Sequence, residues 1–478
     1  MKQLLFLLLL FLCISCVKEE EKLASMEVKT DAVAFIEIRN SIDGITLWDH
    51  KTDTIYPNEK NEFLFTKDIK IPEFVSIKIG DTRLNSILLP GKKVKITSLD
   101  STYVFEGTNK AGMQFLNDVE RPNFYMSESN KYKNDTTAVQ VTKKMETLKV
   151  AELKKLQKLV KDQEIDAEFE KILKQEIDYF YALRTSQIVT VKQYGKTPIA
   201  ADLILLIDET VQKYPLETSY KTSTWSMYAE TILKEKRTYD VLTEGTITKD
   251  TLSSFYKRDA LHPFYYNMIS SYENKEVAEK AAATYIISEA KQRKFEKSLI
   301  SVYEQFQKDF PNSIYESYLT PDIDEIREYY VKISGEMPAS VKFYENENIA
   351  SLNDLLSDLK GEKYYVDLWA TWCSPCKREF KHNDELNILL KEKGYKKLYI
   401  SLDKPEQRAK WKQDIKYFDL SGLHLLASKK FFVDFETNHS LADGYITIPQ
   451  YLIIDATGNL VTNNAPRPSQ MEKLREFL

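Results

Sequence analysis

The alternation of apolar and polar residues changes twice along the chain. From residue 25 to 108, apolar residues recur at every second position, as around Ile36 and Val75. A period of two is typical of strands that bury one face. Turn-forming pairs such as Pro90-Gly91 separate these runs. We therefore predict a small antiparallel β-sandwich over residues 25–108.

A helical period follows over residues 109–334. Leu153, Leu156 and Val160 lie on one stripe, and Lys and Glu fill the opposite face. Prolines such as Pro321 are expected to end helices, so several antiparallel helices are predicted. The many Tyr and Phe residues of this region indicate a packed core, and a peptide groove is the alternative. We interpret the region as a scaffold.

Strand and helix patterns alternate in the third part, residues 335–478. The run Tyr364–Ala370 has the character of a buried strand and leads through a tight turn into Cys373-Ser-Pro-Cys376 and a helical segment. The whole pattern predicts an α+β multidomain protein. It consists of an N-terminal antiparallel β-domain, a helical middle segment and a C-terminal α/β domain.

The first residues have the pattern of an export signal. Lys2 precedes an apolar run of 11 residues, Leu4–Ile14, which is short of the roughly 20 residues that span a bilayer. We predict a signal peptide over residues 1–15. The run ends in Ser15-Cys16 and resembles a bacterial lipoprotein signal, which implies lipidation of Cys16 and a charged tether over residues 16–24. Cys13 stands where Leu is usual, so an ordinary secretory signal is the alternative.

Length, composition and charge exclude some classes of protein. The 478 residues fit two or three domains. The 43% of hydrophobic residues excludes a wholly disordered chain. A net charge of −5, from 67 Lys and Arg against 72 Asp and Glu, argues against nucleic acid as a partner.

The four cysteines form two pairs, Cys13 with Cys16 and Cys373 with Cys376. Two pairs so far apart exclude a disulfide framework. The five histidines are scattered and do not complete a zinc site, so we expect no metal. A cysteine at the start of a helix has a lowered thiol pKa, which indicates that Cys373 is a nucleophile.

Two motifs in the third part resemble the TlpA-like disulfide reductases of the thioredoxin superfamily, which are anchored to membranes. One is Trp369-Ala-Thr-Trp-Cys-Ser-Pro-Cys376, and the other is Ile448-Pro449 ahead of a strand. Asn464-Ala-Pro-Arg-Pro-Ser469 resembles the branch found in Bacteroidota. The resemblance implies a thioredoxin fold for residues 335–478. Ser469 and Glu472 are expected to form a capping box for the last helix.

The resemblance also implies roles for single residues. Cys373 attacks a disulfide, Cys376 resolves the mixed disulfide, and the buried Asp367 exchanges a proton with Cys376. The substrate-binding residues are Trp372, Ile448 and a cis Pro449. A lysine partner of the aspartate falls near Lys396 or Lys397, and the pattern leaves the choice open.

The implied function is reduction of disulfides in client proteins by a lipoprotein of the cell envelope, without a cofactor. A membrane electron donor or another thiol reductant would regenerate the dithiol. The outer membrane is expected, on its periplasmic side, with surface exposure as an alternative. Three other interpretations stay open: a disulfide isomerase or oxidase of the same fold, a peroxiredoxin, and a peptide- or glycan-binding lipoprotein with a non-catalytic thioredoxin module.

Overall fold

The computed structural model describes residues 23–30, 33–42, 45–46, 52–99, 102–121, 131–193, 199–217, 222–344, 346, 349–439 and 446–478. The predicted signal peptide and Cys16 lie outside these residues. The chain divides into two compact units, Met1–Lys236 and Arg237–Leu478. Among the described residues, no helix is both long enough and apolar enough to span a membrane.

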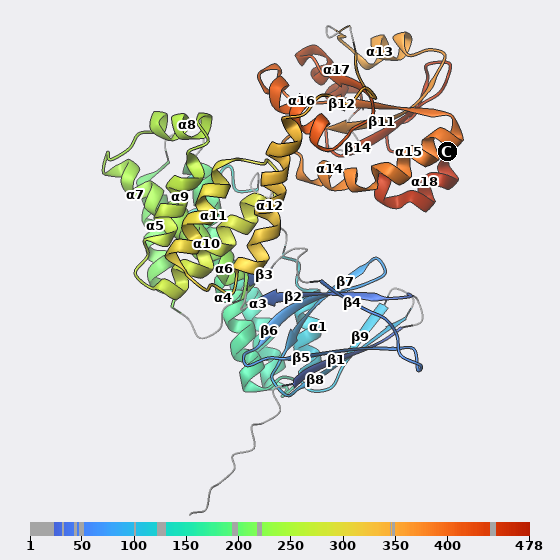
Figure 1. Ribbon diagram of the computed structural model, residues 1–478. Helices are drawn as coiled ribbons and strands as arrows, with labels where there is room; N and C mark the ends of the chain where they lie inside the picture. Colours follow the sequence, from blue (N-terminus) through green and yellow to red (C-terminus); the bar gives the residue numbers. More distant parts are fainter. Residues whose placement is uncertain are drawn as a thin grey trace, which may run out of the picture. The chain divides into compact units, whose positions relative to one another are not determined.

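Two β-sheets make up the N-terminal part of the first unit (Figure 1). One has the order β5-β1-β8-β9, and the other has the order β3-β2-β6-β7 with β4 beside β2. The strands are β1 (Leu23–Lys29), β2 (Ile36–Ile42), β3 (Ile45–Thr46), β4 (Thr52–Ile55), β5 (Glu62–Asp68), β6 (Glu73–Ile79), β7 (Thr82–Leu88), β8 (Lys93–Leu99) and β9 (Thr102–Glu106).

The predicted antiparallel β-domain is confirmed, with one difference. β1 pairs with β8 in parallel, whereas the other strand pairs of these sheets, among the described residues, are antiparallel. Because β2 to β7 come between β1 and β8 in the chain, β8 reaches β1 by a crossover rather than by a hairpin. Alternate residues such as Ile38 and Ile77 point into a core shared with Phe169 of a neighbouring helix.

The first unit continues into helices α1 (Lys110–Asp118), α3 (Ala138–Lys161), α4 (Ala167–Gln193), α5 (Ala201–Lys213), α6 (Ser223–Thr231) and a π-helical turn (Ile232–Lys236). Thr137 and Gln140 form a capping box that begins α3. Leu156 and Phe169 bury the apolar stripes of α3 and α4 against the β-sheets. The helical middle segment is thus confirmed.

The remaining helices of the middle segment belong to the second unit. They are α7 (Arg237–Thr243), α8 (Lys249–Lys257), α9 (Leu261–Ser270), α10 (Lys275–Ala290), α11 (Ser298–Asp309) and α12 (Glu316–Ile333). The expected break at Pro321 is wrong, because α12 runs through it. Pro321 removes one backbone hydrogen bond near the helix start, and the buried side chains of Ile323, Ile326 and Tyr329 hold the following turns in place.

A six-stranded sheet forms the centre of residues 335–478, with the order β10-β13-β12-β11-β14-β15. The strands are β10 (Val341–Phe343), β11 (Lys363–Trp369), β12 (Tyr395–Ser401), β13 (Gly422–Leu426), β14 (Gln450–Ile454) and β15 (Leu460–Thr462). β10 to β13 pair in parallel, and β14 and β15 are antiparallel. Val366, Ile400 and Ile453 lie on central strands, as predicted.

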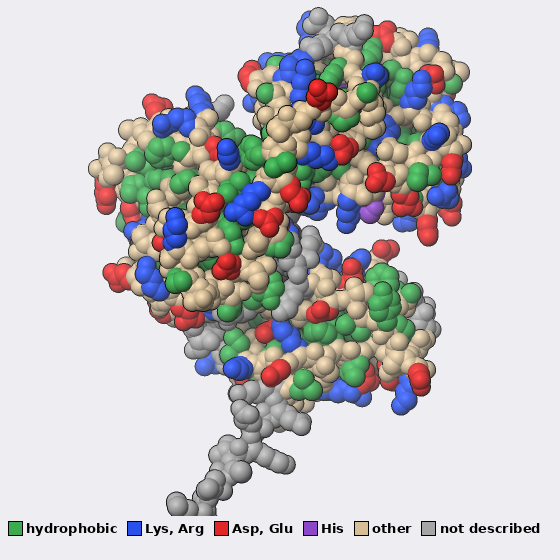
Figure 2. Space-filling model, viewed as in Figure 1, with side chains coloured by type: hydrophobic (Ala, Val, Ile, Leu, Met, Phe, Trp, Pro, Cys, Tyr) green, Lys and Arg blue, Asp and Glu red, His purple; other side chains and the backbone are tan. Residues whose placement is uncertain are grey.

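Helices cover both faces of this sheet. α13 (Leu352–Asp358) and α17 (Lys429–His439) pack on one face. The other face carries α14 (Ser374–Glu379), α15 (Asn383–Lys393), α16 (Arg408–Tyr417) and α18 (Met471–Phe477), together with short 3₁₀ turns at Phe380–His382, Pro405–Gln407 and Pro468–Gln470. A mixed sheet between two helical layers confirms the α/β thioredoxin fold. Acidic and basic side chains are interspersed over the visible face of the molecule (Figure 2).

Candidate active site

The two predicted redox cysteines are joined in a disulfide at the start of α14. Cys373 is the N-cap residue of this helix, and the main-chain N–H of Cys376 donates a hydrogen bond to Cys373 Sγ over 3.2 Å. A donor aimed at the sulfur favours its thiolate form once the disulfide is reduced. Cys373 is 3% exposed and Cys376 is fully buried. Trp372 beside them is 53% exposed.

A buried carboxylate fixes the turn that carries the cysteines. Asp403 accepts hydrogen bonds from the main-chain N–H of Thr371 over 2.9 Å and from its hydroxyl over 2.7 Å. The hydroxyl of Ser401 donates a third hydrogen bond over 2.7 Å. The residues directly before Cys373 are therefore held by the end of the neighbouring strand β12.

Asp367 lies on β11, the strand that leads into the cysteine turn, and is 3% exposed. Burial raises the pKa of Asp367 to about 7, the charge of Lys397 opposes this shift, and the charge of Glu379 adds to it. Asp367 Oδ1 has no hydrogen-bond partner among the described residues. Such a carboxyl can take up and release a proton near neutral pH.

The structure decides between the two lysines that the sequence left open. Lys397 pairs with Tyr365 in the β11–β12 register, is buried, and donates to Asn383 Oδ1 over 2.6 Å. Burial lowers the pKa of Lys397 to about 7, and the charge of Asp367 opposes this shift. Lys396 points the other way and pairs with the exposed Glu362. Lys397 is thus the electrostatic partner of Asp367.

Glu379 belongs to the same charged cluster and was missed by the sequence analysis. It accepts hydrogen bonds from the main-chain N–H of Ser469 over 2.9 Å and from its hydroxyl over 3.0 Å. The predicted capping box of Ser469 and Glu472 is therefore wrong, because Ser469 bonds across the fold to α14. Gln470 is the N-cap residue of the last helix and makes no side-chain cap.

The predicted substrate-binding residues lie at the same end of the sheet. The Ile448–Pro449 peptide bond is cis. Ile448 packs against the apolar cluster that contains Cys373, Cys376 and Trp369. The residues between 440 and 445, which precede this loop, lie outside the described part of the chain.

A group of metal-ligand type occurs on the helices of the second unit. Asp259, His262 and Glu296 bring their ligand atoms within 4.8 Å of one another. Protein partners occupy these groups. His262 Nδ1 lies 2.6 Å from Tyr285 Oη, its Nε2 lies 3.0 Å from Glu296, and Asp259 accepts two hydrogen bonds from Ser298. These contacts link the group to α10 and α11.

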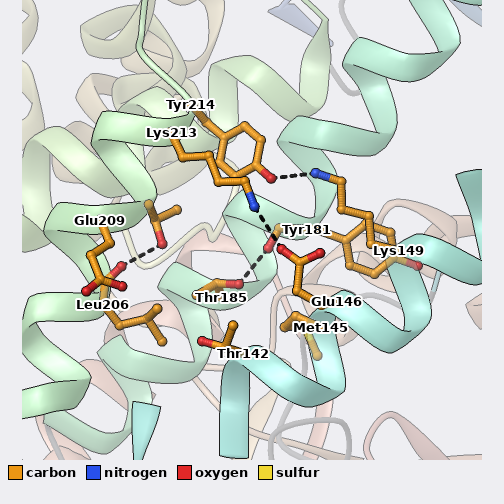
Figure 3. A pocket seen from close by; sticks show the side chains of 11 residues that line it. Thr142, Met145, Glu146, Lys149, Tyr181, Thr185, Leu206, Glu209, Lys213 and Tyr214 are labelled. Atoms are coloured by element: carbon orange, nitrogen blue, oxygen red, sulfur yellow. Dashed lines mark hydrogen bonds and ion pairs between the residues drawn. The ribbon is translucent and has the colours of Figure 1, made fainter. Parts of the chain in front are cut away.

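A cavity of about 120 Å³ lies between α3, α4 and α5 in the first unit (Figure 3). Its polar side chains bond to one another, with Lys149 donating to Tyr214 Oη and Lys213 pairing with Glu146. Pockets for small molecules usually measure about 300–1,000 Å³. This cavity is therefore smaller than a usual small-molecule pocket.

Comparison with known families places the cysteine pair in a defined domain. Residues 337–476 match the Redoxin family model. A thiol-disulfide oxidoreductase ResA of Bacillus thuringiensis subsp. konkukian is 30% identical over 125 residues, which are 26% of this chain and 65% of the relative. The ResA of Oceanobacillus iheyensis is 45% identical over 51 residues, which are 11% of this chain and 27% of the relative. The chain thus spans less than two thirds of the length of these relatives.

Part of the chain is also similar to solved structures. The thioredoxin domain of a thiol-disulfide oxidoreductase from Bacteroides vulgatus shares 23% identity over 26% of this chain and 80% of its own, with a TM-score of 0.21. The exposed lipoprotein thioredoxin Etrx1 of Streptococcus pneumoniae shares 24% identity over 26% and 90%, also with a TM-score of 0.21. The thioredoxin fold follows from the strand order β10-β13-β12-β11-β14-β15. Residues 337–476 are thus similar to the Redoxin family and to thiol-disulfide oxidoreductases, and they hold the Cys373–Cys376 pair.

Proposed function

We propose that the protein is a thiol-disulfide oxidoreductase of the cell envelope that reduces disulfides in client proteins through Cys373 and Cys376. The observation that carries this proposal is the pair itself. It is closed at a helix start, with a donor aimed at Cys373 Sγ, and follows a strand that carries a buried carboxyl with a pKa raised to about 7.

In the proposed reaction, the Cys373 thiolate attacks one sulfur of the client disulfide and displaces the other as a thiolate. Asp367 takes the proton of Cys376, whose sulfur then attacks Cys373 and releases the second client thiol. The client gains two electrons and the protein is left with its disulfide. A membrane electron donor or another thiol reductant returns the protein to the dithiol. The reaction requires no cofactor.

Two cysteine variants test the assignment of roles. Cys373→Ser should abolish reduction of an insulin-type disulfide, because a hydroxyl is hardly ionised at neutral pH. Cys376→Ser should keep the attack and trap a mixed disulfide at Cys373, visible by mass spectrometry. A Cys376→Ser protein that turned over at the parental rate would contradict the proposal.

The direction of transfer is tested by the reduction potential of the pair. A reductase should equilibrate with glutathione at a potential near that of thioredoxin, about −270 mV, whereas an oxidase would lie nearer −120 mV. A value at the oxidising end would favour the isomerase or oxidase interpretation. Peroxide consumption by the purified protein would instead indicate a peroxiredoxin.

The envelope location rests on the first residues of the sequence, outside the described structure. We propose that residues 1–15 are removed and that a lipid on Cys16 anchors the chain to the outer membrane of a Bacteroidota-type envelope. Mass spectrometry of the mature N-terminus tests this proposal. An unmodified N-terminal residue other than Cys16 would refute the anchor and leave the proposed chemistry unaffected.

A further inference from the structure

The helices of the second unit contact the redox helix directly. The hydroxyl of Ser374, between the two cysteines, donates to the main-chain oxygen of Lys291 over 2.9 Å. Lys377, directly after Cys376, donates through Nζ to the main-chain oxygen of Arg293 over 2.6 Å. The loop that follows α10 therefore lies against the first turn of α14, and α12 contacts α16 beside it (Figure 1).

The side chain of Lys377 ends in a network of charged groups, two of which are fully buried. Its side chain and that of Asp414 are both 0% exposed, and Nζ lies 2.7 Å from Asp414 Oδ2. Asp414 Oδ1 accepts hydrogen bonds from Lys410 over 2.7 Å and from the hydroxyl of Tyr329 over 2.9 Å. Burying a charge is costly unless it is paired, and this network provides the pairing.

Aromatic packing holds the loop in place. Arg293 and Phe295 have φ of 53° and 56°. Residues other than glycine rarely adopt this left-handed backbone conformation. The Phe295 ring stacks on Tyr329 with centroids 4.5 Å apart and packs edge-on against Tyr417 at 4.9 Å. Helices α12 and α16 thus hold in place the main-chain oxygen of Arg293, which accepts the hydrogen bond from Lys377 Nζ.

Lys377 lies close enough to Cys373 along α14 for its charge to act on the Cys373 thiolate. Residues four apart on a helix share a face, with Cβ atoms about 5–6 Å apart, and Lys377 N donates to the main-chain oxygen of Cys373 over 3.2 Å. Lys377 thus lies one turn after Cys373, and its ammonium lies on the side of α14 that faces α16 and the loop after α10. A nearby cation favours a thiolate over a thiol. Burial lowers the pKa of Lys377, the charges of Asp414 and Asp403 oppose this shift, and the charge of Arg293 adds to it.

We propose that Lys377 is a positioning residue of the redox pair, held in place by the helical segment, and that its buried ammonium shifts the dithiol–disulfide equilibrium toward the dithiol by stabilising the Cys373 thiolate. The inference rests on the proposed function. At equilibrium with glutathione, Cys373 and Cys376 lose two protons and two electrons as their S–S bond forms, and one glutathione disulfide takes them up as two glutathione thiols.

The test compares full-length Lys377→Met with the parent in glutathione buffers at pH 7. Asp414 keeps Lys410 and Tyr329 as partners in this variant, so its carboxylate is not left alone. We expect the equilibrium constant to shift about tenfold toward the disulfide, which equals a potential about 30 mV more negative. The Cys373 thiol pKa, followed by thiolate absorbance, should rise. Lys381→Met, which changes an exposed lysine one turn further on, should match the parent.

A second variant keeps the test decisive if Lys377→Met does not fold. Lys410 is 28% exposed, and Lys410→Met leaves the Lys377–Asp414 pair intact, so a smaller shift in the same direction is expected. Variants that melt at a lower temperature but keep the parental equilibrium constant would overturn the inference, because they would show a purely structural role. A parent that does not exchange with glutathione would contradict the proposed function itself.

Discussion

At the scale of single residues, Asp367 combines deep burial with a position behind the cysteine turn. Burial raises its pKa to about 7, so the carboxylate that accepts a proton is present mainly above pH 7. Resolution of the mixed disulfide should therefore accelerate as pH rises through about 7. Asp367→Asn should remove this rise and slow the step by about 10²-fold or more at pH 8.

Rapid-mixing measurement of client release between pH 5 and 9 checks this prediction. Asp358→Asn, on the short helix α13 at the opposite face of the sheet, is the matched control and should keep the parental profile. An Asp367→Asn protein with an unchanged pH profile would show that water or another group takes the proton.

The same scale shows what the sequence can specify. The motif around Cys373 and Cys376 and the strand alternation that buries Asp367 are local patterns, and all were predictable. The choice between Lys396 and Lys397 depends on the β11–β12 register, which pairs residues 32 positions apart. The Glu379–Ser469 hydrogen bonds join residues 90 positions apart. Such contacts depend on tertiary packing, which no single-sequence pattern contains.

At the scale of elements, the turn between β11 and α14 depends on one carboxylate. Asp403→Ala would leave the buried N–H of Thr371 and the hydroxyls of Thr371 and Ser401 without their acceptor. We expect the free energy of unfolding to fall by about 2–4 kcal/mol. Urea titration monitored by circular dichroism measures this change. Glu406→Ala, on the exposed turn that follows, should stay within about 0.5 kcal/mol of the parent.

A buried histidine on β13 makes stability depend on acid. His424 stacks on Tyr399 with centroids 4.7 Å apart, and burial lowers its pKa from 6.5 to about 4. Between these values the unfolded chain binds the proton and the folded chain does not, so stability is complete above pH 6.5 and falls toward pH 4. The loss from this residue should be about 3 kcal/mol.

Urea titrations at pH 7 and pH 4 test the histidine prediction. His424→Gln should lose less stability than the parent between these two pH values, whereas His382→Gln, on the partly exposed end of a 3₁₀ turn, should lose as much as the parent. Equal losses in the parent and His424→Gln would show that other groups govern the acid response.

The partners and ends of the strands and helices show where the sequence pattern and the tertiary packing give different results. The period of two located β2, β6 and β8, but it could not reveal that β1 and β8 run in parallel, because both directions bury the same alternate residues. Pro321 was expected to end a helix, and the buried stripe of α12 outweighs the lost hydrogen bond. Periodicity therefore gives the type of an element better than its partner or its end.

At the scale of the whole molecule, the second unit joins helices α7–α12 to the thioredoxin-fold segment that matches the Redoxin family model. A fragment of residues 337–478 would expose Lys377 and Asp414, which are now buried, and would expose more of the rings of Tyr417 and Phe418, which are now partly buried. We expect it to melt about 10 °C or more below a fragment of residues 237–478. Calorimetry of the two fragments checks this, and equal melting temperatures would show that the helices add no stability.

The place of β1 in its sheet determines how a lipid anchor would act. β1 begins at Leu23 and is paired on both sides, by β5 and β8. Only the residues from Cys16 to Leu23 would connect it to the lipid, and a fully extended chain of that length spans about 25 Å. The β-sandwich of an anchored protein would therefore stay within about 25 Å of the headgroups, and insertions before Leu23 would increase this distance.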